Sequence, residues 1–182
     1  MLFRSSFGSP AFLNFGANYA GARDEYVYAY SQDGPSAYET SDAIVLARAP
    51  KDRLRDRAAW EFWKGNGEWA RDIAQRAPVF RFPQHCQRVD AVYNAGLKRY
   101  LLAVAYNRQG GWGIYDAPDP WGPWTTAFHT GYWGQGETHG YRLPAKWISA
   151  DGRKMSLVFS GLLFNGVSND AFCVREMTLD VK

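Results

Sequence analysis

Glu137 lies in a glycine-rich segment, residues 131–140, whose side chains suit the binding of a sugar. Trp133 and Tyr141 provide rings on which a sugar can stack, and His139 provides an imidazole that can serve as a base near neutral pH. If the segment borders a binding site, polar donors, a carboxyl group and stacking rings would meet there. The alternative is a plain connecting loop, in which a lone histidine has no chemical role.

Arg88 and Asp90 are two residues apart in a segment that alternates like a β-strand, so we expect both side chains on one face of it. They are candidates for facing a ligand, and a buried structural ion pair between them explains the same pattern equally well. Trp112 is bracketed by glycines, an arrangement that can leave an indole face open for a sugar. Asp24 precedes an expected strand, where aspartate is favoured by hydrogen bonding to its own backbone.

Several functional classes are excluded by what the sequence lacks. It contains no glycine-rich phosphate loop, serine-nucleophile elbow, zinc pattern or dinucleotide fingerprint, so we expect no cofactor and no metal. Lys and Arg number 21 against 18 Asp and Glu, a net charge of +3. The one basic run, residues 51–57, alternates with acids and is typical of a solvated turn or short helix. We therefore expect no nucleic-acid partner.

Three stretches share one order: a strand, a polar turn and then an apolar strand. They are residues 9–30, 89–104 and 143–160. Repeats too small to bury their own apolar face are typical of stacked or radially arranged β-units, most commonly propeller blades. The innermost strand of each blade lines a central channel, so polar residues near its start converge on one place. We predict an all-β fold, a partial β-propeller of about three antiparallel blades, in a single domain over residues 1–182.

The blade-like units are expected roughly over residues 8–66, 84–130 and 131–182. Residues 69–84 are expected to be an irregular crossing between blades, because their prolines argue against a long helix. In the third unit we expect strands over residues 143–149 and 152–160, with a hairpin turn at Asp151-Gly152. This unit is one strand short, and residues 1–7 are a candidate to complete it or to pair with another chain.

The cysteines and the apolar segments say little about the cellular compartment of the chain. Cys86 and Cys173 are not spaced as metal ligands, so we expect free, buried thiols. A disulfide between them is the alternative if the chain is exported. The first residues lack the long apolar core of a signal peptide, and no run approaches the roughly 20 apolar residues of a membrane span. We expect a soluble chain with no membrane partner, in a compartment that the sequence does not identify.

Beyond these patterns, the sequence resembles the carboxyl-terminal half of the family known as domain of unknown function 4185. The similar passages span most of the chain and are residues 7–10, 24–30, 45–50, 60–63, 93–102, 120–124 and 146–149. That family is in turn similar to the five-bladed propellers of glycoside hydrolase family 43, in which a small-Gly-Pro-Trp motif ends a blade strand. Gly122-Pro123-Trp124 matches that motif.

The second resemblance implies a catalytic arrangement. In those enzymes an Asp base, a second Asp that tunes pKa values and positions substrate, and a Glu acid come from three blades around the hub. Glycoside inversion requires two carboxyl groups roughly 6.5–9.5 Å apart, one protonated and one ionised. The resemblance matches Asp90 to the tuning position and Glu137 to the acid. The enzymes' base lies in a leading blade that precedes this chain, so we do not expect a complete triad.

Three functions are consistent with these observations. The first is a glycosidase-like propeller fragment that binds carbohydrate at its hub, through Arg88, Trp112, Trp133, His139 and Tyr141, without hydrolysing it alone. The second is an inverting glycoside hydrolase, the only enzyme class that we expect, whose site is completed when open blade edges pair in a homo-oligomer. The third is a structural or protein-interaction module with no sugar site.

Overall fold

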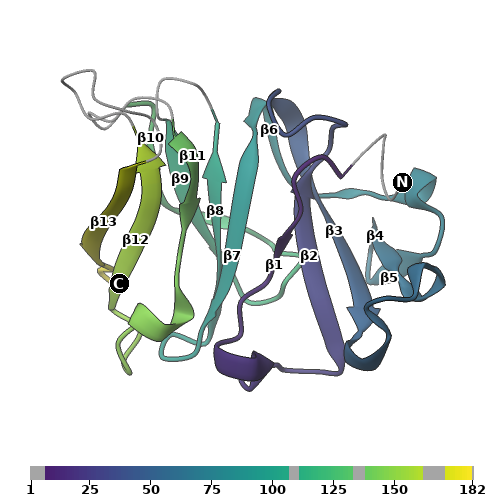
Figure 1. Cartoon of the computed structure of the whole chain (residues 1–182), viewed down its shortest axis with the longest axis horizontal. Helices are drawn as coiled ribbons and strands as arrows, with labels where there is room; N and C mark the ends of the chain where they lie inside the picture. Colours follow the sequence, from purple (N-terminus) through teal and green to yellow (C-terminus); the bar gives the residue numbers. More distant parts are fainter. Residues whose placement is uncertain (1–6, 107–110, 133–137, 162–170, 182) are drawn as a thin grey trace.

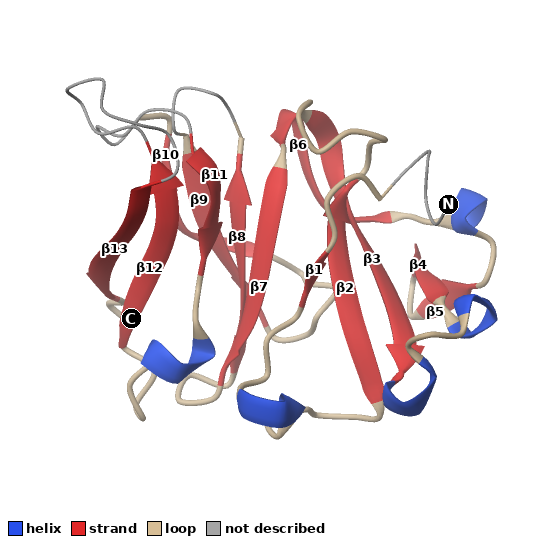
Figure 2. Cartoon of the chain, in the orientation of Figure 1, coloured by secondary structure: helices blue, strands red, loops and turns tan. Residues whose placement is uncertain are grey.

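The computed structural model describes residues 7–106, 111–132, 138–161 and 171–181, whose strands form three antiparallel sheets that follow one another along the molecule (Figure 1). Helix is limited to single 3-10 turns in these residues, as Figure 2 shows. None of these turns has the length or the apolar character needed to cross a membrane.

The first sheet is the largest and has the order β1-β2-β3-β4-β5, with β6 also paired to β3. Its strands are β1 (Ala11–Phe12), β2 (Tyr26–Gln32), β3 (Ser41–Pro50), β4 (Glu61–Gly65), β5 (Glu68–Ala70) and β6 (Pro78–Cys86). The single turns between them are η1 (Ala17–Tyr19), η2 (Lys51–Arg53), η3 (Arg57–Ala59) and η4 (Ile73–Gln75). The apolar strand expected at the end of residues 9–30 is confirmed as β2, and the turn or short helix expected within residues 51–57 is confirmed as η2.

The strand β6 corrects one prediction, because residues 69–84 were expected to be irregular. It runs antiparallel to the first half of β3, from Ser41↔Cys86 to Val45↔Pro78, with two register shifts. Proline excludes a helix interior, but a strand accepts it at its first residue or at a bulge, where no ladder hydrogen bond is lost. Pro78 is the first residue of β6 and pairs directly at one of the register shifts.

The second sheet has four strands in the order β10-β9-β8-β7. They are β7 (Arg88–Asn94), β8 (Arg99–Ala105), β9 (Trp112–Ala117) and β10 (Thr125–Thr130), as the sequence predicts. The strands β7 and β8 pair without interruption from Arg88↔Ala105 to Asn94↔Arg99. The strand β7 lies at the edge of its sheet, in the position of an innermost blade strand.

The third sheet has the order β11-β12-β13, one strand fewer than the second within the described residues. Its strands are β11 (Thr138–Arg142), β12 (Lys154–Gly161) and β13 (Ala171–Thr178), and the turn η5 is Ala145–Trp147. The strand expected over residues 143–149 is therefore wrong, since Pro144 starts a 3-10 turn there and the inner strand lies earlier. Asp151-Gly152 does form a turn, which leads from η5 into β12, with Gly152 at a φ of 75°.

The amino-terminal residues do not complete the third sheet where they are described. Phe7 packs on Phe62 of the first sheet, with ring centroids 5.6 Å apart. Residues 1–6 lie outside the described part of the chain. Figure 1 places β13 at the opposite end of the molecule from β4, on which Phe7 packs.

Two apolar layers join the three sheets. In β8, Tyr100, Leu102 and Val104 face the first sheet, whereas the alternating Leu101 and Ala103 face the third. Trp121 stacks on Trp63 in the first layer, at 5.1 Å between ring centroids, so it packs between blades. The thiols are both free, with Cys86 buried in the first layer and Cys173 half-buried beside the second.

The inner strands of the three sheets are neighbours, and β7 lies between β11 and β1 (Figure 1). Where β1 ends, Asn14 forms a parallel bridge to Val92 of β7. Its N–H donates to the carbonyl of Ala91 at 2.9 Å, and its carbonyl accepts from Tyr93 at 3.0 Å. The junction between the first two sheets, which we call the first seam, is thus closed by backbone hydrogen bonds.

Candidate functional site

The start of β7 directs its polar side chains toward the third sheet. Val89 and Ala91 alternate into the apolar layer shared with the first sheet. Arg88 and Asp90 therefore point the other way, as the two-residue spacing predicts, and both reach the backbone of the segment that contains β11. The strand period thus brings the predicted pair to the junction of β7 with β11, which we call the second seam.

The second seam is closed by side chains that bind the backbone of the opposite segment. The Arg88 Nη1 donates to the carbonyl of His139 at 2.6 Å. In return, the Arg142 Nη1 donates to the carbonyl of Val89 at 2.9 Å. Asp90 Oδ2 accepts a 2.8 Å hydrogen bond from the backbone N–H of Leu143. Each of these three bonds gives a backbone group at the seam a side-chain partner.

Asp90 is the most perturbed carboxyl group of this region. Its side chain is 14% exposed, and Oδ1 lies 3.8 Å from the Arg142 Nη1. Burial raises the pKa of Asp90 to about 6, although the Leu143 hydrogen bond and the Arg142 charge both lower it. The expected structural ion pair is present, but its basic partner is Arg142 and not Arg88. A carboxyl held in this way can exchange a proton near neutral pH, and both of its oxygens face fixed partners.

An exposed aromatic ring lies beside Arg88, on a residue that the sequence did not single out. Tyr38 is 70% exposed and belongs to the loop between β2 and β3. The Arg88 guanidinium lies 5.7 Å from its ring centroid and donates from Nε to the carbonyl of Ala37 at 3.4 Å. The residues that meet here come from all three sheets, and we call them the hub surface: Tyr38, Arg88, Asp90, His139 and Arg142.

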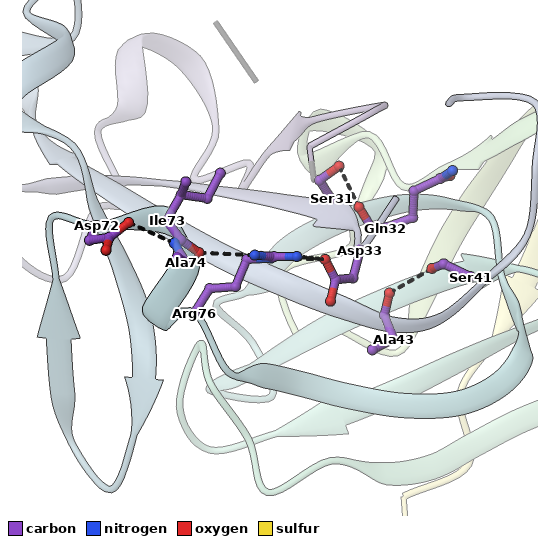
Figure 3. A network of polar contacts seen from close by, with 9 residues as sticks. All are labelled: Ser31, Gln32, Asp33, Ser41, Ala43, Asp72, Ile73, Ala74 and Arg76. Atoms are coloured by element: carbon purple, nitrogen blue, oxygen red, sulfur yellow. Dashed lines mark hydrogen bonds and ion pairs between the residues drawn. The ribbon is translucent and has the colours of Figure 1, made fainter. Parts of the chain in front are cut away.

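A buried glutamine side chain holds the loop that contains Tyr38. Gln32 donates from Nε2 to the carbonyls of Ser36 and Glu39, the latter at 2.8 Å. A polar cleft of about 440 Å³ lies where this loop meets β6. Figure 3 shows the side chains of Asp33 and Arg76 pointing toward one another. Both residues line the cleft, and the Arg76 Nη2 lies 2.7 Å from the Asp33 Oδ1. Asp33 belongs to the loop and is paired with Arg76, so we interpret the cleft as a structural feature that holds Tyr38 in position.

Two of the expected stacking residues are part of the core instead. Trp112 is 2% exposed and stacks on Tyr141, which is equally buried, with ring centroids 4.6 Å apart. The glycines beside Trp112 leave room for this packing and do not open an indole face, so the prediction of a sugar platform there is wrong. His139 is exposed at the hub surface. Glu137 and Trp133 lie outside the described residues.

Metal chemistry has no support in the part of the chain that the structure describes. Within residues 7–106, 111–132, 138–161 and 171–181, no three His, Cys, Asp or Glu side chains gather closely enough to hold a metal ion. The hub surface instead offers two guanidinium groups, a carboxyl of raised pKa and an open aromatic ring. Such groups recognise polar ligands that also have an apolar face, of which sugars are the common example.

Comparison with known proteins identifies a family and structures of similar fold. The family model described as "Domain of unknown function (DUF4185)" matches residues 3–163. A search of curated proteins gives no match. An exo-beta-1,3-galactanase from Phanerochaete chrysosporium, crystallised with beta-1,3-galactotriose, is similar over 98% of this chain and 42% of its own, with 12% identity and a TM-score of 0.51. A thermostable family-43 glycoside hydrolase is similar over 98% of this chain and 55% of its own, with 10% identity and a TM-score of 0.47.

The chain therefore spans less than half the length of the galactanase, 42% of it. At 12% identity this likeness concerns the fold alone. It confirms the predicted architecture, a part of the five-bladed propeller of glycoside hydrolase family 43, with three antiparallel sheets as its blades.

Proposed function

The chain belongs to the family described as "Domain of unknown function (DUF4185)", and from that membership and its propeller fold we propose that the hub surface binds carbohydrate without hydrolysing glycosides on its own. The observation that carries the proposal is the convergence of Tyr38, Arg88 and Asp90 with β11 at the inner strands of the sheets. The galactanase of similar fold was crystallised with a bound trisaccharide, which supports carbohydrate as the ligand class.

Binding without hydrolysis is supported by the state of Asp90. Its Oδ2 accepts from the Leu143 N–H and its Oδ1 faces Arg142, so both oxygens have partners within the chain. Inversion needs a second carboxyl group that works opposite the first. The candidate for it from the sequence is Glu137. Hydrolysis of glycosides by the isolated chain, abolished by Glu137→Gln, would contradict this part of the proposal.

The test is the replacement Tyr38→Ala. Because the ring is exposed, its removal should leave the thermal unfolding midpoint within about 2 °C of wild type, since exposed side chains contribute little to stability. Removal of a stacking platform should weaken saccharide binding about tenfold, as expected for the loss of roughly 1–2 kcal/mol. Differential scanning calorimetry measures the unfolding midpoint, and calorimetric titration with a panel of oligosaccharides measures the affinity.

The matched control for Tyr38→Ala is Trp147→Ala. Trp147 is also an exposed ring beside a cation, the Lys146 Nζ, and it lies in η5, close to the opposite end of β11 from His139. We expect Trp147→Ala to leave saccharide affinity unchanged. If both replacements weaken binding equally, or if no saccharide binds, the hub surface is not the carbohydrate site.

A second candidate function, an inverting glycoside hydrolase completed by oligomerisation, is favoured by the outer face of the third sheet. Phe172 is 74% exposed and Val174 45% exposed, on the same face of β13. In the described residues, β13 pairs only with β12, so its other edge can receive a strand. Apolar side chains beside an open edge are a suitable surface for another copy of the chain.

Solution mass measured by light scattering over a range of concentrations tests this second candidate. It predicts an oligomer that Phe172→Glu reduces to a monomer, since a buried charge at the interface is strongly unfavourable. Leu54→Glu is the control, because Leu54 is an exposed apolar residue that follows η2 in the first sheet. A wild-type chain that is monomeric at every concentration would remove the composite-site hypothesis.

A further inference from the structure

The two arginines of the hub surface are bonded mainly to neutral groups. The Arg88 guanidinium donates to the carbonyls of Ala37 and His139. Arg142 donates to the carbonyl of Val89 and has Asp90 at 3.8 Å, a distance beyond hydrogen bonding. The Asp90 oxygen with a close hydrogen bond, Oδ2, accepts it from the backbone N–H of Leu143. Two positive charges thus lie at the second seam, and the carboxylate of Asp90 pairs only loosely with one of them, that of Arg142.

Several donors of these guanidinium groups are not used within the described chain. A guanidinium carries five N–H donors, and backbone carbonyls occupy the Nε and Nη1 of Arg88 and the Nη1 of Arg142. Among the described residues, no acceptor lies within hydrogen-bond distance of the Arg88 Nη2 or of the Arg142 Nε and Nη2. The Arg142 side chain is 46% exposed, so its unused donors are accessible to a ligand.

We propose that the hub surface selects saccharides that carry a carboxylate, the uronates, and that Arg142 and Arg88 bind this group; the inference rests on the proposed function of the same surface. A planar guanidinium fork matches the two oxygens of a carboxylate, and charge-assisted bonds of this kind are about twice as strong as neutral ones. The exposed Tyr38 ring beside Arg88 provides a stacking face for the sugar that bears the carboxylate.

The chain offers a matched control for the charge of Arg142. Arg55 is exposed, and no residue of the described chain pairs with it. It follows η2 beyond the end of β3, whereas Arg88 lies two residues after Cys86, which pairs with Ser41 at the start of that strand. Arg55→Gln and Arg142→Gln therefore each remove one positive charge, the first at the opposite end of β3 from Arg88 and the second at the hub surface.

The experiment is calorimetric titration of the whole chain with trimers of galacturonate, glucuronate and mannuronate, each compared with its carboxyl-reduced neutral counterpart. We expect at least one uronate to bind about tenfold tighter than its neutral counterpart, as one charge-assisted hydrogen bond would give. Arg142→Gln should abolish that preference, whereas Arg55→Gln should retain it. Arg142→Lys keeps the charge but loses the fork, and should retain only part of the preference.

The outcomes separate this inference from the proposed function. Equal affinity for a uronate and its neutral counterpart would overturn the selection of carboxylates and leave carbohydrate binding intact. Equal losses in Arg55→Gln and Arg142→Gln would also overturn it, because they would mean unspecific charge attraction. Binding of neither kind of trimer would overturn both proposals. Circular dichroism of each variant identifies a loss of affinity that comes from unfolding, and Arg142→Lys then decides the result.

Discussion

At the residue scale, the buried carboxyl of Asp90 sets a pH dependence of stability. Its pKa is raised to about 6 in the folded chain, whereas an unfolded aspartate titrates near pH 3.9. Between these values the folded protein keeps a proton that the unfolded chain has lost. The contribution of Asp90 to the free energy of unfolding therefore falls as the pH rises from about 4 to about 6, and it stays low above that.

The replacement Asp90→Asn isolates this effect, because asparagine keeps an oxygen acceptor for the Leu143 N–H but cannot ionise. We expect the variant to be more stable than wild type at pH 7 by roughly 2–3 kcal/mol, and the difference to approach zero near pH 4. Urea unfolding of both proteins from pH 4 to pH 7.5 measures it. A difference that does not change with pH would mean that the carboxyl is not desolvated as the structure indicates.

At the element scale, the second seam depends on two turns that touch. Gly96, between β7 and β8, and Gly152, before β12, approach so closely that a β-carbon on Gly96 would collide with the backbone of Asp151 and Gly152. Asn94 fixes the same contact, because its buried Nδ2 donates to the Gly152 carbonyl at 2.8 Å. The hub surface at one end of the seam and this contact at the other hold β7 against the third sheet.

We expect Gly96→Ala to lower the free energy of unfolding by roughly 1–3 kcal/mol, the usual effect of overpacking at a rigid contact. Gly96 does not have a positive φ, so the effect would be steric and not conformational. Gly131→Ala is the control, since a β-carbon there meets no atom within 4 Å. Denaturant titration of both variants should give a loss only for Gly96→Ala; equal stabilities would contradict the tight contact.

At the scale of the whole molecule, β8 joins the three sheets into one unit. One of its faces packs in the layer shared with the first sheet, and the other in the layer shared with the third. We therefore predict that residues 1–182 unfold as a single domain, with calorimetric and van't Hoff enthalpies that agree. Differential scanning calorimetry checks this, and a separate transition for the third sheet would divide the chain into two domains.

The sequence predicts what depends on side-chain pattern and misses what depends on context. The strands β2, β3, β7 and β8 follow from their apolar residues and polar turns, and the partial propeller follows from their repetition. The strand β6 was missed because prolines exclude a helix but not an edge or bulged strand. The strand β11 was missed because its glycine-rich surroundings indicate a loop, whereas pairing with β12 determines its structure.

The candidate site was predicted only in part for the same reason. Alternation along β7 was sufficient to place Arg88 and Asp90 on one face. The ring of Tyr38 was not identified, because a tyrosine in a polar turn has no periodicity that indicates its exposure. Glycines beside Trp112 indicated an open face, but burial of the ring depends on Tyr141, far away in the sequence.

The two seams also predict how related sequences should diverge. Asn14 and Val92 meet through backbone groups, so that contact places no demand on either side chain. At the hub surface, every hydrogen bond of the second seam joins a side chain of one segment to the backbone of the other. Each such bond constrains one position and leaves its partner free to vary. Apart from the ion pair of Asp90 with Arg142, neither seam should therefore produce pairs of positions that change together during evolution. Contact inference from correlated substitutions would recover the strands within each blade more readily than the junctions that arrange the blades around the hub.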